Sequence, residues 1–141
     1  MDFFKWKDTY SVQNTLIDNQ HKEIIRILNC LNNAFIEKKT DSVVEVVIND
    51  LIEYTKIHFK TEEDIFKEID YKFNEEHIEE HNLFITQVAE FKARFKRNNS
   101  ALTIQIMNFL RKWLISHILD SDQNYIDAFE KSGVNSSNAL A

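Results

Sequence analysis

The chain has 141 residues and a formal net charge of −6, with no proline and one glycine, Gly133, near its end. The scarcity of turn residues argues against β-architectures and glycine-rich phosphate loops, and the acidic balance disfavours nucleic-acid binding. We therefore predict one all-α domain. No apolar run approaches the roughly 20 residues of a membrane span, so we expect no membrane partner. No signal-peptide pattern is present and Cys30 is the single cysteine, so we expect the protein to be cytoplasmic.

The first 14 residues carry too many aromatic side chains for a free tail. These are Phe3, Phe4, Trp6 and Tyr10. We expect residues 1–14 to form an ordered aromatic arm that packs across the helical body. The domain is then expected to span residues 1–133, with residues 134–141 as a flexible C-terminal tail.

Apolar residues spaced by threes and fours predict four long helices in the rest of the chain. We expect them over residues 15–38, 41–69, 74–97 and 100–131. Asp41, Asn74 and Ser100 are the expected N-caps of the last three helices, and Gly133 follows the end of the fourth. The links between the helices are short, which favours antiparallel neighbours and an up-down-up-down four-helix bundle.

All five histidines of the chain fall on the apolar stripes of these predicted helices. They are His21, His58, His77, His81 and His117. The stretch HIEEH places His77 and His81 four residues apart, about 400° of helix turn, so their side chains share one face. A buried imidazole needs partners for both ring nitrogens, and five such rings together are hard to explain as core residues. Metal ligation gives one nitrogen of every ring a partner.

Carboxylates join two of these histidines. Glu62 follows His58 by four residues and lies on the same helical face. After His117, Asp120 lies about 60° away on a regular helix, whereas Asp122 lies about 140° away unless a π-bulge widens the helix. Spacing alone leaves the choice between Asp120 and Asp122 open.

Five imidazoles and two carboxylates exceed the four ligands of a single structural zinc ion. They suit two six-coordinate ions bridged by both carboxylates and by an oxide or hydroxide. That arrangement leaves one position open, where a small ligand would bind. Imidazole ligands suit iron, copper, zinc or nickel, and spacing does not select among them.

With these motifs in order, the sequence resembles the hemerythrin family, specifically its single-domain bacterial members. The matching stretches are IDNQHK at His21, HFKTEE at His58 and Glu62, HIEEH at His77 and His81, and HILDSD at His117 and Asp122. The resemblance implies a non-haem di-iron centre (Fe2+/Fe3+, bridged by oxide or hydroxide) that binds dioxygen reversibly, and a carrier or store rather than an enzyme.

Position by position, the resemblance implies that His77, His81 and His117 ligate one iron. His21 and His58 would ligate the other iron, which keeps the open position, and Glu62 and Asp122 would bridge the pair. The same resemblance implies an apolar lid over the oxygen position, although ordinary core packing explains these residues equally well; they are Ile24, Trp113, Leu114 and Ile118.

Other functions also fit parts of this pattern of residues. Oxygen or redox sensing, or handling of nitric oxide or peroxide, would use the same di-iron site, and nothing in the sequence indicates a protein partner. The stretch from His77 to His81 also matches the H-x-x-E-H pattern of zinc peptidases, with Glu80 as base, but that interpretation leaves three histidines unexplained. The Glu-x-x-His pairs of ferritin-like oxidases are absent, and a metal-free helical adaptor would make five buried histidines a coincidence.

Overall fold

The computed structural model describes residues 4–97 and 103–133. Within these ranges the regular secondary structure is helical, with no strand, which confirms the all-α prediction. The α-helices are α1 (Thr15–Ile36), α2 (Asp41–Glu68), α3 (Asn74–Arg97), α4 (Thr103–Ser116) and α5 (Ile126–Ser132).

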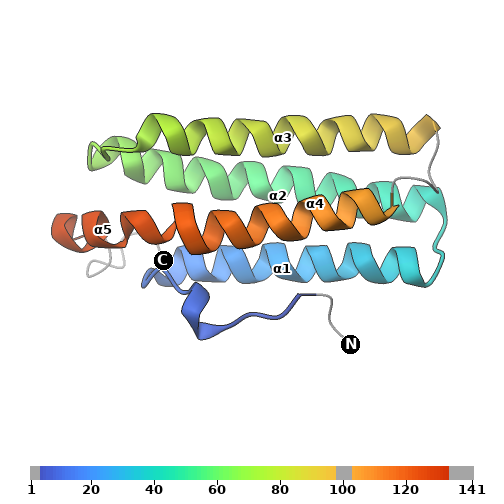
Figure 1. Ribbon diagram of the computed structural model, residues 1–141, viewed down its shortest axis with the longest axis horizontal. Helices are drawn as coiled ribbons and strands as arrows, with labels where there is room; N and C mark the ends of the chain where they lie inside the picture. Colours follow the sequence, from blue (N-terminus) through green and yellow to red (C-terminus); the bar gives the residue numbers. More distant parts are fainter. Residues whose placement is uncertain (1–3, 98–102, 134–141) are drawn as a thin grey trace.

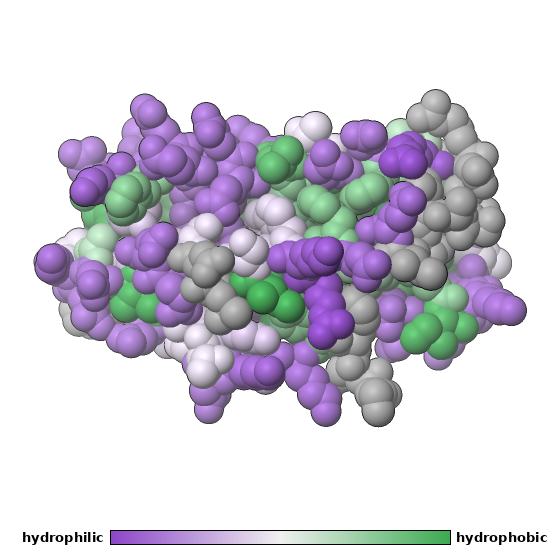
Figure 2. All heavy atoms as spheres, in the orientation of Figure 1, coloured by the Kyte–Doolittle hydropathy of each residue, from purple (hydrophilic) through white to green (hydrophobic). Residues whose placement is uncertain are grey.

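The four long helices α1 to α4 lie side by side, and α5 extends beyond the end of α4 (Figure 1). Each long helix contacts the next one, and α4 also contacts α1, so the four enclose a common core. The link from α1 to α2 lies at one end of the molecule and the link from α2 to α3 at the other. Hydrophilic residues cover most of the face drawn in Figure 2, where hydrophobic residues form separate patches.

Side-chain caps fix where the helices begin, and two of the expected caps are wrong. Asn14 caps α1, because its Oδ1 accepts a hydrogen bond from the Ile17 amide at 3.1 Å. Thr40 caps α2 through the Val43 amide, so Asp41 is the first helical residue instead. Asn74 already lies inside α3 and its Oδ1 makes no hydrogen bond. The expected cap Ser100 lies outside the described residues.

The fourth predicted helix is not continuous. A π-helical turn, His117–Ser121, follows α4, and a short 3-10 turn, Gln123–Tyr125, leads into α5. The Asp122 amide donates to the His117 carbonyl at 2.8 Å, a bond that spans five residues instead of four. Gly133 ends α5 as expected, with a left-handed φ of 81° that suits glycine.

The N-terminal segment, residues 4–14, lies along α1. Phe4 and Tyr10 are buried, and the Phe4 backbone exchanges two hydrogen bonds of 2.8 Å with the Asn29 side chain. The Trp6 and Tyr10 rings meet edge to face at 5.7 Å. Phe3 lies outside the described residues.

Two apolar clusters fill the interior, and polar residues lie between them. Along α1, Ile17 belongs to the smaller cluster and Ile24 to the larger one, with the buried His21 in between. Along α2, Glu62 separates Phe59 from Ile65 in the same way. The fold therefore holds a buried polar layer across the bundle. None of the described helices has the length and apolar character needed to span a membrane.

Candidate metal centre

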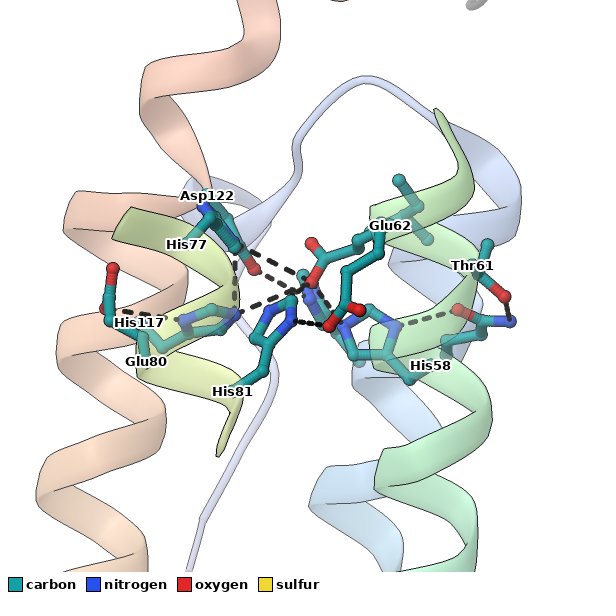
Figure 3. A network of polar contacts seen from close by, with 12 residues as sticks. His58, Thr61, Glu62, His77, Glu80, His81, His117 and Asp122 are labelled. Atoms are coloured by element: carbon teal, nitrogen blue, oxygen red, sulfur yellow. Dashed lines mark hydrogen bonds and ion pairs between the residues drawn. The ribbon is translucent and has the colours of Figure 1, made fainter. Parts of the chain in front are cut away.

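Seven side chains from all four long segments of the bundle meet in this polar layer, six of which are labelled in Figure 3. Each is at most 2 % exposed. They are His21 on α1, His58 and Glu62 on α2, His77 and His81 on α3, and His117 and Asp122 at either end of the π turn. Every side chain that the sequence analysis named as a candidate ligand, other than Asp120, is therefore brought together. The side chain of Asp120 lies outside the described residues.

The π turn is what brings Asp122 to the cluster. Its Oδ1 lies 2.8 Å from His77 Nε2 and 3.0 Å from His117 Nε2, while its Oδ2 lies 2.9 Å from His21 Nε2. Each oxygen of this carboxylate thus faces a different set of imidazoles. An ordinary α-helix would turn residue 122 about 140° away from His117.

Glu62 occupies the centre of the cluster. Its Oε1 lies 3.1 Å from His81 Nε2, 3.3 Å from His58 Nε2 and 3.6 Å from His117 Nε2. The potential ligand atoms form two groups, each within 4.8 Å, and Glu62 belongs to both. One group contains Glu62 with His77, His81 and His117, and the other contains Glu62 with His21, His58 and Asp122.

The inward-facing atoms of these residues have no hydrogen-bond partner. Among the described residues, the buried side-chain atoms without a hydrogen bond belong to this cluster, except Tyr71 Oη and Asn74 Oδ1. They include Nε2 of all five histidines, Glu62 Oε1 and both Asp122 oxygens. Buried polar atoms are nearly always satisfied, so nitrogen and oxygen lone pairs that converge in this way fit one or more cations.

The outer atoms of His58, His81 and Glu62 are held by hydrogen bonds, whereas Nδ1 of His21 and of His117 makes none. His58 Nδ1 contacts Gln20 Oε1, and His81 Nδ1 contacts Glu63 Oε2, both at 2.7 Å. Tyr125 Oη donates to Glu62 Oε2 at 2.7 Å. These partners orient the ligand side chains, as outer partners do at metal sites.

Sequence reasoning missed Gln20, Glu63 and Tyr125, although a signal was present. Gln20 directly precedes His21, Glu63 directly follows Glu62, and Tyr125 comes one turn after Asp122. Polar residues close in sequence to the expected ligands were therefore candidates for this role. Which ligand each of them contacts depends on how the helices pack, and sequence spacing does not reveal that.

Comparison with known proteins gives the family. A model of the hemerythrin HHE cation binding domain matches residues 13–129. The chain belongs to the hemerythrin family. A bacteriohemerythrin of Pseudomonas paraeruginosa is 35% identical over 127 residues, which cover 90% of this chain and 82% of that protein. A bacteriohemerythrin of Clostridium acetobutylicum is 34% identical over 129 residues, covering 88% of this chain and 99% of that one.

A solved structure of wild-type hemerythrin has a similar fold. It matches with a TM-score of 0.81 at 24% identity, covering 89% of this chain and 97% of the other. At this identity the likeness concerns the fold alone. The hemerythrin family therefore accounts both for the helical arrangement and for the buried cluster of histidines and carboxylates.

Burial and neighbouring charges act in opposite directions on the pKa values of the residues in this cluster. Burial lowers the pKa of His58 in spite of the nearby Glu62 carboxylate. Burial also acts to lower the pKa of His117, but the Asp122 and Glu62 carboxylates outweigh it and raise that pKa well above its ordinary value. Burial acts to raise the pKa of Glu62, yet His58, His117 and His81 hold it well below its usual range. Without a metal, protons on imidazoles balance the buried carboxylates, and a cation would take the place of those protons.

Apolar and aromatic side chains border the cluster on one side. Ile24, Leu114 and Ile118 are buried in the larger apolar cluster, and the partly buried Trp113 packs against that cluster. The Trp113 ring stacks on His117 with centroids 4.4 Å apart. This contact helps to fix the plane of the His117 imidazole.

Glu80, the base of the zinc-peptidase alternative, does not face the cluster. Both of its oxygens accept hydrogen bonds from Ser121 Oγ, at 2.6 and 2.8 Å. Its Oε1 lies 3.7 Å from Nδ1 of His117, the outer nitrogen of that ring (Figure 3). Glu80 therefore supports the cluster from outside, which argues against a role as a base on metal-bound water.

Proposed function

We propose that this protein binds dioxygen reversibly at a non-haem di-iron centre and carries, stores or delivers oxygen without acting as an enzyme. One observation carries the proposal: the inward nitrogen and oxygen atoms of seven buried ligand-type residues converge without hydrogen-bond partners. Membership of the hemerythrin family, with relatives named bacteriohemerythrin, supports iron among the metals that imidazole suits.

In this proposal the two groups of ligand atoms hold one iron ion each. His77, His81 and His117 ligate the first iron, and His21 and His58 ligate the second. Glu62, which belongs to both groups, and Asp122, whose two oxygens face different imidazoles, would hold both ions, together with an oxide or hydroxide. When bound, the irons would supply the electrons for reversible dioxygen binding and an open position on the side with two histidines.

The residues of the chain position and protect this centre. Tyr125 holds Glu62 by its outer oxygen, so the inner oxygen stays directed at the imidazoles. Apolar side chains exclude water that would otherwise promote irreversible oxidation; these are Ile24, Trp113, Leu114 and Ile118.

The proposal includes the architecture around the site. Helix contacts and links at alternate ends support an antiparallel up-down-up-down four-helix bundle. We also propose that residues 1–14 form an aromatic arm, of which the described part, residues 4–14, lies along α1. The functional domain comprises residues 1–133, and we place the protein in the cytoplasm. The proposed tail, residues 134–141, lies outside the described residues.

An optical spectrum tests the function directly. The purified protein, loaded with iron and reduced without air, is exposed to oxygen and then returned to an oxygen-free atmosphere. We expect two irons per chain and an absorption band that appears with oxygen and disappears on its removal. Prompt, irreversible conversion to a ferric form would instead favour redox sensing or the handling of nitric oxide or peroxide at the same site.

A variant tests the ligand assignment separately. His77→Ala removes an imidazole whose Nε2 lies 2.8 Å from Asp122 Oδ1. We expect this variant to lose tightly bound iron. Retention of two irons per chain would refute the assignment of His77.

A further inference from the structure

Two ligand histidines make hydrogen bonds of equal length to partners of different charge. His58 Nδ1 contacts the neutral amide of Gln20 at 2.7 Å, and His81 Nδ1 contacts the carboxylate of Glu63 at the same distance. His58 and His81 belong to different halves of the proposed centre. The structure thus contains two contacts of equal length that differ in the charge of the acceptor, with Glu63 also more exposed than Gln20.

The orientation of the Gln20 amide is fixed by its neighbours. Thr61 Oγ1 donates to the Ile57 carbonyl at 3.0 Å, so its remaining lone pairs accept from Gln20 Nε2 at 3.2 Å. Gln20 Oε1 is then left to accept from His58, as the contacts drawn between His58 and Thr61 in Figure 3 show. The proton of the His58 ring therefore sits on Nδ1, and Nε2 presents its lone pair to the centre.

A second carboxylate lies near the side of the centre with three histidines. Glu80 is 3.7 Å from His117 Nδ1, beyond hydrogen-bond distance, and is held there by two hydrogen bonds from Ser121. On this side, therefore, His81 has a hydrogen-bonded carboxylate and His117 has only a nearby negative charge, since its Nδ1 makes no hydrogen bond. His58, on the other side, has an amide.

A carboxylate acceptor draws the N–H proton of an imidazole toward itself and makes the inner nitrogen a stronger electron donor, whereas a neutral amide does so less. Stronger donors favour the ferric state of the metal they ligate. Building on the function proposed above, we infer that the hydrogen bond between His81 and Glu63, together with the nearby charge of Glu80, favours the ferric state in the half with three histidines, while Gln20 keeps the half with the open position ferrous. Glu63, Glu80 and Gln20 are positioning and tuning residues, because they act on the metals through the histidines.

The functional consequence concerns the half of the centre that has no open position. If dioxygen binds on the side of His58, the iron on the other side would also supply an electron. The hydrogen bond of His81 to Glu63, with the charge of Glu80 nearby, would favour the loss of that electron. The uncharged partner of His58 lets the open side stay ferrous between binding events.

Reciprocal substitutions of nearly equal shape test the inference. Glu63→Gln removes the charge and keeps an oxygen acceptor, and Gln20→Glu adds a charge at the equivalent contact. Iron content is measured first, and the ferric/ferrous midpoint potential is then measured by spectroelectrochemistry. We expect Glu63→Gln to shift the equilibrium about tenfold toward ferrous, or about 59 mV for a one-electron couple, and Gln20→Glu to shift it by a similar factor toward ferric.

A matched control separates the hydrogen bond from simple charge. Glu79→Gln removes the same charge from an exposed position on α3. Opposite shifts in the two test variants, with little change in the control, support the inference. An equal shift in Glu79→Gln, or no shift in a test variant that keeps two irons, overturns it and leaves the proposed function intact. Failure of the unmodified protein to bind two irons overturns both. If Glu63→Gln does not hold iron, the direction of the Gln20→Glu shift decides alone.

Discussion

Substitution of Asp122 by asparagine tests the π turn and the bridging carboxylate together. Asparagine preserves the shape of the side chain, but its amide nitrogen replaces one of two oxygens that lie 2.8 to 3.0 Å from three imidazoles. An amide NH2 group cannot ligate a metal, so one half of the centre loses a ligand. Substitutions of outer partners alone cost about 10- to 100-fold in metal affinity, so about 100-fold is a lower estimate for this ligand.

A 100-fold loss of affinity corresponds to about 2.8 kcal/mol. Metal binding stabilises the folded state in proportion to the logarithm of affinity, so the stabilisation by metal falls by this amount. For a chain of this length, about 4 °C of melting temperature corresponds to each kcal/mol. We therefore expect the rise in melting temperature on adding Zn2+, a redox-inert probe, to be about 10 °C smaller in Asp122→Asn than in the unmodified protein.

The assay is differential scanning calorimetry of each protein with and without Zn2+, alongside iron analysis after reconstitution. Comparing each variant with its own metal-free form removes effects on the fold itself. Asp120→Asn, on the same turn, is the matched control and should keep the full metal-dependent rise. A full rise in Asp122→Asn, or a loss confined to Asp120→Asn, would show that residue 122 is not the bridging ligand.

Four further predictions concern the site and its surroundings. Because the pKa of His117 is raised in the folded protein, protonation of His117 stabilises the metal-free fold fully at pH values below the ordinary pKa of 6.5. This stabilisation is lost as pH rises through the raised pKa, so the melting temperature of the metal-free protein should fall over that range. A melting temperature that does not change with pH would contradict this. Zn2+ binding at pH 7 should release protons for the same reason, and equal heats in buffers of different protonation enthalpy would argue against it. Ile24→Ala should admit water to the site and speed irreversible oxidation of the iron. It should also lower the free energy of unfolding by about 2 to 5 kcal/mol. If the absorption band of the oxygenated protein decays at an unchanged rate, Ile24 is not part of a lid. Asn29→Ala removes both hydrogen bonds to Phe4 and should loosen the N-terminal segment at a cost of about 1 to 3 kcal/mol, visible as a red shift of tryptophan fluorescence.

The sequence determined much of this site because its ligands recur at helical spacing. His77 and His81, like His58 and Glu62, lie four residues apart, and α-helical geometry alone places each pair on one face. Asp122 could not be chosen in that way, because a π turn depends on hydrogen bonds that spacing does not specify. Family resemblance favoured Asp122, and the π turn supplies the physical reason.

Other features needed the packed structure. Thr40 and Asp41 are both good capping residues, and their order along the chain does not tell which one starts the helix. The predicted fourth helix reads as a single amphipathic run, so its interruption after Ser116 was not visible in the apolar pattern. The partners of His58 and His81 come from other helices, and only the packing of α1, α2 and α3 brings them into contact.

The near-complete burial of the seven ligand-type side chains also bears on how metal enters. Each is at most 2 % exposed, and they come from α1, α2, α3 and the segment that follows α4, so the surrounding side chains or helices must move for an ion to enter or leave. We expect the loading and loss of metal to depend on a local opening of the bundle. Metal exchange should then be slow whatever the affinity, and its rate would report how often the bundle opens locally.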